Sequence, residues 1–130
     1  MKRRDWLFWV VALIAAGTVI TGAAQLIAPR TVLALIGGAL TDDAAYSFAI
    51  VGMFMVIIGA LLVHTLFDSA DHPIVALWAA VQKLGASAAV GLGVLDDRFA
   101  PIALAVAVFD LTSGGLLLVY LARLRRTAPP

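Results

Sequence analysis

The chain has 130 residues, of which 63% are hydrophobic and only 13% are charged, nine Lys or Arg and eight Asp. A soluble domain has about 45–50% apolar and about 25% charged residues. So little charge cannot cover a water-facing surface, which excludes an ordinary cytosolic protein, a disordered chain and a nucleic-acid-binding protein. There is no Cys, which excludes disulfides, thiolate catalysis and Cys-ligated metal centres.

Four long apolar stretches follow one another along the chain, at residues 6–28, 44–67, 74–95 and 102–121. Each reaches the length of about 20 residues that a helix needs to cross a bilayer core about 30 Å thick. Helices are favoured because backbone groups inside a bilayer must pair within the segment, and the alternation typical of a β-barrel is absent. The sequence therefore predicts an all-α protein, a four-transmembrane-helix bundle that forms one integral membrane domain over residues 1–130.

The first span follows Met-Lys-Arg-Arg and so resembles a secretory signal. We expect it to stay uncleaved, because its 23 residues exceed the apolar core of about 7–15 residues of such a signal. Pro29 ends this span, since the residue before a Pro resists the helical conformation. The next segment, Thr31–Leu40, is too short to cross the bilayer and contains Gly37-Gly38. It is predicted to be an interfacial or re-entrant segment.

The placement of Lys and Arg predicts the orientation. Six of the nine basic residues lie in the two tails: Lys2, Arg3, Arg4, Arg123, Arg125 and Arg126. The connections between the spans hold only Arg30 and Arg98. Because basic residues concentrate on the cytoplasmic side, both termini are predicted to be cytoplasmic. Arg outnumbers Lys seven to two, which is typical of a GC-rich bacterial source, so we expect a multi-pass protein of a bacterial inner (plasma) membrane.

Two charged residues, Lys83 and Asp110, lie inside the spans, near the middle of the third and the fourth. Each charge at the centre of a membrane helix costs about 2.5–3.5 kcal/mol, a cost normally offset by pairing. Around the turn that joins these two spans, their depths differ by roughly 6 Å. Both also lie on faces of small side chains, where membrane helices approach closely. We predict a buried ion pair, either a lock that fixes the helix register or a site for a proton, an ion or a substrate.

Polar residues near this pair are candidates to complete a network: Gln82, Ser87, Thr112, Ser113 and, from the first span, Gln25. A second, weaker cluster lies at the cytoplasmic end of the second span. It consists of His64, Asp68 and His72, spaced four residues apart as metal ligands on one helix face are. Pro73 and a short turn interrupt that face, so we interpret the cluster as a solvated turn and predict no metal site.

Conventional catalytic motifs are absent: the sequence has no Gly-rich phosphate loop, no His-Glu-x-x-His and no Gly-x-Ser-x-Gly. We therefore expect no enzyme and no cofactor. The leading hypothesis is a non-enzymatic subunit or scaffold that binds lipid and other membrane subunits, or a second copy of itself. The alternative is a small proton- or ion-coupled transporter or channel that uses Lys83 and Asp110. A quinone-linked membrane enzyme is the third possibility.

One family pattern is similar to this chain. It combines Pro29, Gly37, Gly52 and Gly59 with Lys83-Leu84-Gly85 in the third span and Asp110 in the fourth. With these residues the chain resembles the small four-helix bacterial membrane proteins grouped near the DoxX-like proteins. That resemblance covers most of the chain and implies a small membrane subunit beside a quinone-linked oxidoreductase, with no catalytic residue of its own.

Overall fold

The computed structural model describes residues 4–127, which form five helices and no strand. These are α1 (Trp6–Ile27), α2 (Pro29–Leu35), α3 (Asp42–Phe67), α4 (Pro73–Leu95) and α5 (Ala103–Thr127). All except α2 are long and apolar enough to cross a membrane. The predicted all-α architecture, with four spans and a short helix after the first, is confirmed.

The ends of the helices follow from local chemistry. Asp5 and Thr41 each accept a hydrogen bond from a backbone N–H in the first turn of α1 and α3, which satisfies a donor that has no partner inside the helix. Pro29 and Pro73 lie in the first turns of α2 and α4, where a missing N–H costs little. The predicted ends agree within two residues except at the fourth span, where α5 continues to Thr127. The extension, residues 122–127, holds three Arg with one Ala and one Leu, residue types that favour a helix whether or not it lies in a bilayer.

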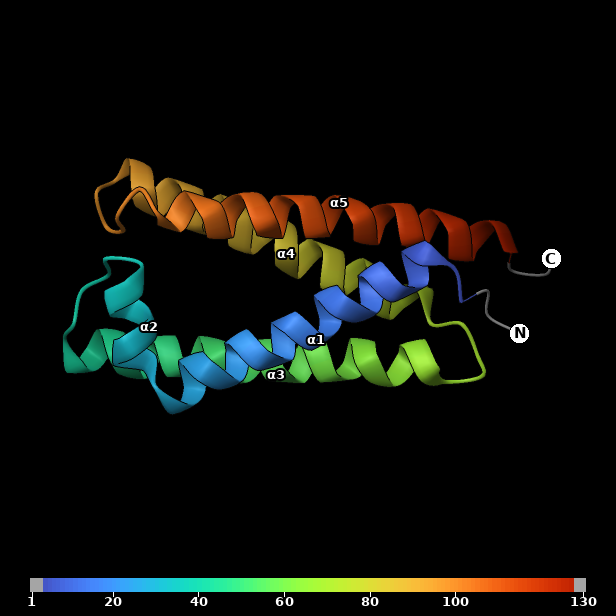
Figure 1. Cartoon of the computed structure of the whole chain (residues 1–130), viewed down its shortest axis with the longest axis horizontal. Helices are drawn as coiled ribbons and strands as arrows, with labels where there is room; N and C mark the ends of the chain where they lie inside the picture. The colour runs from blue at the N-terminus through green and yellow to red at the C-terminus, as the bar shows by residue number, and fades with distance from the viewer. Residues whose placement is uncertain (1–3, 128–130) are drawn as a thin grey trace.

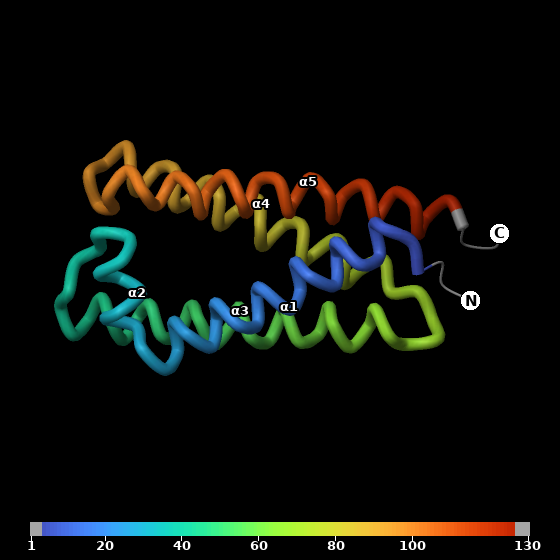
Figure 2. Tube along the Cα trace, in the orientation of Figure 1, coloured from blue at the N-terminus to red at the C-terminus, as the bar shows by residue number. Residues whose placement is uncertain are grey.

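The helices are arranged in two halves, a first half of α1–α3 and a second half of α4 and α5 (Figure 1). The start of α1 and the end of α5 lie at one end of the molecule, which we call the packed end. The opposite end, where α2 and the turn at 96–101 lie, we call the open end. The two halves meet at the packed end and diverge toward the open end (Figure 2).

Large buried side chains fill the packed end. Phe8 and Val11 of α1 and Leu117 of α5 are almost completely buried there, in a core that all four long helices share. An ion pair between Asp5 and Arg123 joins α1 to α5 at the same end. This half of the molecule therefore resembles the close-packed interior of an ordinary bundle.

Glycines bring α1 and α3 into contact within the first half. A Cβ atom placed on Gly22 would lie 2.7 Å from the backbone oxygen of Gly52, and one placed on Gly52 would lie 2.6 Å from that of Gly22. Gly59 lies equally close to Val19. Only Gly permits the two backbones to approach this closely. The C-terminal part of α1 therefore packs on α3 and lies away from α5.

Contacts between backbone segments connect the two halves at the open end. The N–H of Ala100 donates to the carbonyl oxygen of Ile36 at 2.9 Å and so ties the second half to α2. Gly37, with a φ of +70°, turns the chain directly against Ala100. Arg30 donates to the carbonyl oxygen of Leu40 and pairs with Asp42, which holds α2 against the start of α3.

Candidate functional site

The structure brings Lys83 and Asp110 together. Lys83 Nζ donates a hydrogen bond to Asp110 Oδ1 at 2.8 Å, and the two side chains are only 4% and 8% exposed. Lys83 lies one residue from the middle of α4, so the pair lies deep within the predicted membrane core. Its ammonium group also lies 5.6 Å from the centre of the Phe109 ring, within reach of a cation–π interaction.

Small residues on α4 and α5 make this burial possible. A Cβ atom on Gly114 would lie 2.7 Å from the Leu84 side chain, so the two helices approach closely beside the pair. Ser87, one turn after Lys83, donates to the carbonyl oxygen of Ala107 at 2.7 Å. The second half is therefore held together on both sides of the ion pair.

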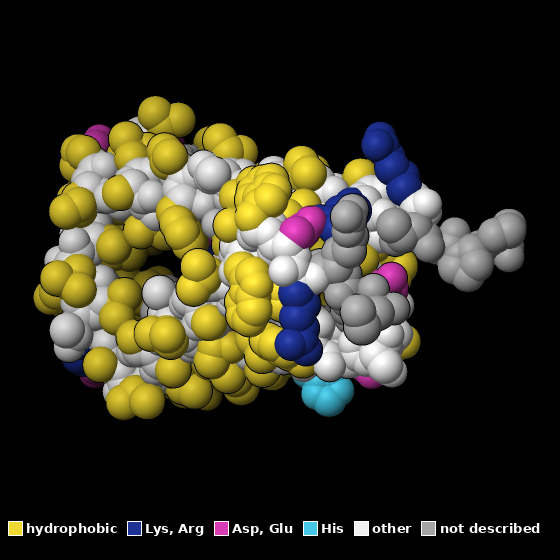
Figure 3. Space-filling view, turned by 45° about the vertical axis from the view of Figure 1, so that its right-hand side comes forward, with side chains coloured by type: hydrophobic (Ala, Val, Ile, Leu, Met, Phe, Trp, Pro, Cys, Tyr) yellow, Lys and Arg dark blue, Asp and Glu magenta, His cyan; other side chains and the backbone are white. Residues whose placement is uncertain are grey.

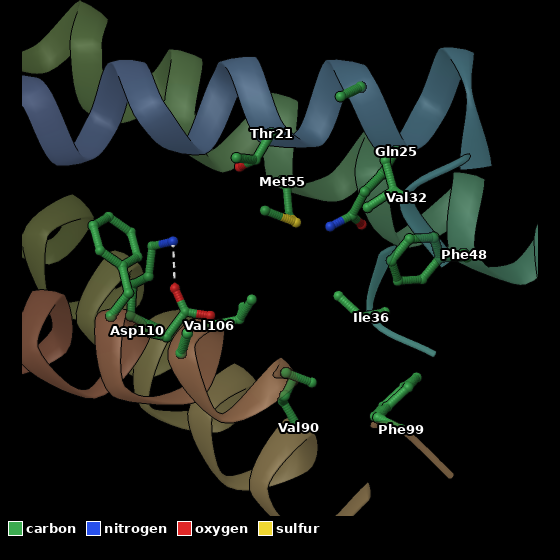
Figure 4. Close-up of a pocket in the computed structure, with 15 residues that line it drawn as sticks. Thr21, Gln25, Val32, Ile36, Phe48, Met55, Val90, Phe99, Val106 and Asp110 are labelled. Atoms are coloured by element: carbon green, nitrogen blue, oxygen red, sulfur yellow. Dashed lines mark hydrogen bonds and ion pairs between the residues drawn. The ribbon is translucent and has the colours of Figure 1, made fainter. Parts of the chain in front are cut away.

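A cavity of about 470 Å³ separates the two halves between the packed core and the open end. Lys83 and Asp110 lie at its second-half wall, and Gln25 and Thr21 of α1 lie across from them (Figure 4). The rest of the lining is mostly apolar and consists of Ala24, Val32, Ile36, Phe48, Met55, Val90, Phe99, Ala103, Ala105, Val106 and Phe109. At about 30 Å³ for each water molecule in the liquid, the volume equals roughly 16 waters.

Two aromatic side chains separate this cavity from a second hollow at the open end. Phe48 and Phe99 line both the cavity and the second hollow, which measures about 600 Å³ and includes Asp97 and Arg98. Phe99 also packs on Gly93, where a Cβ atom would come within 2.6 Å of its ring. The barrier on this side is thus thin, whereas the packed core closes the other side.

Gln25 is the most unusual polar residue of the cavity. Its Oε1 atom is buried and has no hydrogen-bond partner within residues 4–127. An unpaired buried acceptor costs about 1–3 kcal/mol. The amide group lines the cavity (Figure 4), but the oxygen itself is buried, so a rotation of the amide is needed before a molecule held there can supply the missing donor.

The other predicted network members are placed differently. Ser113 is buried on the same face of α5 as Asp110, and Gln82 lines a small void beside Lys83 on the core side. Thr112 is exposed and donates to the carbonyl oxygen of Val108, one turn earlier on its own helix. Two residues along a helix correspond to a rotation of about 200°, which turns Thr112 away from Asp110.

The weaker cluster at the end of α3 does not form a common site. The helix ends at Phe67, so the spacing of His64, Asp68 and His72 does not continue on one face. His72 Nε2 lies 2.6 Å from Asp68 Oδ2, while His64 stays exposed. This hydrogen bond lowers the pKa of Asp68 below its ordinary value of 3.8. No group of three metal-ligating side chains occurs in the described part of the chain.

Sequence reasoning missed the aromatic and apolar members of the site. Phe48, Phe99 and Phe109 look like ordinary membrane-span residues, and nothing in their spacing distinguishes them from lipid-facing side chains. The sequence spacing does indicate Thr21, because this residue precedes Gln25 by one helical turn on α1. Gly17, one turn before Thr21 on α1, has open space around it and is not among the residues that line the cavity.

Comparisons of the chain with protein-family models, with curated proteins and with solved structures found no match. The resemblance to the DoxX-like proteins therefore stays a prediction.

Proposed function

We propose that this protein is a small proton-coupled membrane transporter whose solute site is the cavity at the Lys83–Asp110 pair. One observation carries the proposal: a cavity between two divergent halves reaches a buried ion pair near the middle of the membrane helices. Transporters commonly bind their substrates near the bilayer midplane, at the interface between two halves that rock against each other. A bundle that only fixes helix register has no need of such a cavity.

The barriers on the two sides of the cavity support the same function. Toward the open end Phe48 and Phe99 line both the cavity and the second hollow, and toward the packed end lies the full core. A single backbone hydrogen bond, from Ala100 to Ile36, is described between α2 and the turn at 96–101. Movement of the two halves at the open end therefore breaks few contacts, as alternating access requires.

The proposed setting is a bacterial inner membrane with the packed end on the cytoplasmic side. Arg123, Arg125 and Arg126 lie toward the packed end, as does Arg4, whereas Arg30 and Arg98 lie at the open end. Basic residues favour the cytoplasmic face. Lys2 and Arg3, which belong to the same predicted cluster, lie outside the described residues. Under this orientation the second hollow faces the periplasm.

A proton-flux measurement in liposomes tests the proposal. Vesicles with a pH-sensitive dye inside receive an imposed pH gradient, and we expect wild-type protein to dissipate it faster than the Lys83→Met/Asp110→Leu double variant. The double variant is used because it leaves no uncompensated buried charge. Asp43→Asn, on the exposed first turn of α3, is the matched control and should behave as wild type.

Equal rates for wild type, double variant and empty vesicles would contradict a transporter and support the competing proposal of a non-enzymatic subunit or scaffold. One observation favours that alternative: Gly85 and Gly115 are exposed on the second half, with open space where a partner helix fits. Purification from native membranes in mild detergent tests it directly. The subunit proposal requires a stable partner protein or a second copy of the chain to co-purify.

A further inference from the structure

We propose that the ligand of the cavity is an uncharged amphiphile that enters sideways from the bilayer. Its apolar body fills the cavity, and its polar group both donates and accepts hydrogen bonds between the Lys83–Asp110 pair and Gln25. This inference rests on the proposed function, because the same cavity is the transport site, and it adds the chemical class and the route of the ligand.

The lining defines the body of the ligand. Three aromatic rings, of Phe48, Phe99 and Phe109, lie together with Met55 and Ile36 in a wall that is mostly apolar. Cavities of about 300–1,000 Å³ with apolar walls and a few convergent polar groups are typical of small-molecule sites. At about 470 Å³, this one fits an aliphatic or aromatic body of moderate size.

The unused hydrogen-bonding capacity defines the polar group. The Lys83 ammonium has three N–H donors, of which Asp110 Oδ1 takes one. The second carboxylate oxygen of Asp110 points into the cavity, and the Gln25 amide faces it from α1 (Figure 4). Gln25 Oε1 lacks a partner in the described part of the chain. Donors and acceptors from both halves therefore border the same cavity, which favours a hydroxyl or an amide.

The charge balance defines the charge of the ligand. Among the described residues that line the cavity, only Lys83 and Asp110 are charged, and their charges cancel. A net charge on the ligand would stay uncompensated in surroundings of low dielectric constant, where its burial is costly. A neutral polar group pays no such penalty.

The exposed part of the lining defines the route. Thr21 and Ala24 of α1 and Ala105, Val106 and Phe109 of α5 are exposed although they line the cavity. These helices touch at the packed end and separate beyond it, so the mouth lies between them on the apolar flank of the molecule (Figure 1). Figure 3 shows a hollow in the hydrophobic surface between the two halves. Within a membrane such a mouth faces lipid chains.

A thiol-protection experiment tests the inference, because the chain has no Cys of its own. Val106→Cys places a thiol in the cavity mouth, and Val108→Cys places one on the exposed outer face two residues away, at nearly the same depth. Each full-length variant is reconstituted in lipid vesicles and labelled with a maleimide at about pH 8. The probes are decanol, decane, decylamine and decanoate, which share one chain and differ in the head group.

We expect decanol to slow labelling of Val106→Cys by about tenfold and the other three probes to slow it much less, because a site built to bond a hydroxyl discriminates strongly against analogues that lack it. No probe should change labelling of Val108→Cys. Adding Gln25→Leu to Val106→Cys should abolish the preference for decanol over decane.

Each contrary result overturns the inference in a different way. Equal protection by decane means that only the apolar body is recognised, and stronger protection by decylamine or decanoate means that the ligand is charged. No protection of Val106→Cys by any probe means that molecules of this class do not enter the mouth from the membrane. Protection by decanol without proton flux would leave the ligand class standing and refute transport, and flux without protection would do the reverse.

Discussion

The Lys83–Asp110 pair yields the sharpest energetic prediction. Two charges inserted separately at helix centres cost about 5–7 kcal/mol together. At their separation of 2.8 Å, and with an effective dielectric constant of about 20, the attraction between them is roughly 6 kcal/mol. The two terms nearly cancel, so the intact pair contributes little net stability even though it is buried.

Removal of one partner unbalances these terms. Lys83→Met or Asp110→Leu removes the stabilising attraction of roughly 6 kcal/mol. Each substitution also removes the insertion cost of one charge, which offsets only about 3 kcal/mol of that loss. We therefore expect each single variant to lose about 3 kcal/mol, in line with the 3–5 kcal/mol typical of broken buried pairs. The double variant loses the attraction and both insertion costs, and should lie within about 1 kcal/mol of wild type.

Reversible unfolding in mixed micelles, titrated with a denaturing detergent, measures these differences. The four proteins form a double-mutant cycle, which isolates the interaction between the two side chains. Additive losses, with the double variant about 6 kcal/mol less stable than wild type, would refute the reasoning. In that case the pair would stabilise the bundle outright, and the double variant could not serve as a folded, inactive control in the flux assay.

Three further predictions concern packing, backbone conformation and pH. Gly22→Ala should lower the free energy of unfolding in the same titration by about 1–3 kcal/mol, because its Cβ would lie 2.7 Å from the α3 backbone. The control Gly85→Ala, in open space, should be neutral or stabilising. Equal effects of the two substitutions would contradict the α1–α3 contact. Gly37→Ala should cost about 1–3 kcal/mol, because its φ of +70° strains a side chain and Ala100 lies against it; an unchanged unfolding midpoint would show that this turn is not formed. The hydrogen bond to His72 lowers the pKa of Asp68 in the folded protein. The ionised carboxylate therefore stabilises the fold at pH values above the unfolded pKa of 3.8. This stabilisation is lost as the pH falls through the lower folded pKa. Asp68→Asn should therefore be less stable than wild type at neutral pH, and the difference should close in acid; a difference independent of pH would rule out the hydrogen bond.

The four spans were predictable because their signal is local. A bilayer sets the length of an apolar segment, and a backbone without water must form a helix, so residues 44–67 already specify α3 to within two residues. The end of α5 was not predictable by the same argument, since hydropathy reports where the membrane ends and not where the helix does. The Lys83–Asp110 contact followed from the cost of burying either charge alone.

The cavity could not be predicted, because it depends on how the two halves diverge. Gly52 and Gly59, seven residues apart, mark a close-packing face of the second span, but their partners on α1 are set by the crossing geometry. Gly52 lies against Gly22, and Gly59 lies against Val19. Helix spacing identifies the face of one helix and leaves open which neighbour covers it.

The path of α1 explains why a cavity and an ion pair occur at the same level. Over its first turns α1 shares the core with α5, to which Phe8, Val11 and Leu117 all belong, and near its end Gly22 packs on α3. The space between α1 and α5 therefore opens just beyond the core, at the level of the pair. Lys83 lines both the small void on the core side and the cavity, so it lies at the boundary between them. A polar pair fully enclosed by the core would be only a register lock, and one facing lipid would be unstable. At this boundary the pair is shielded from lipid and still accessible to a molecule in the cavity, which is the arrangement that a binding site requires.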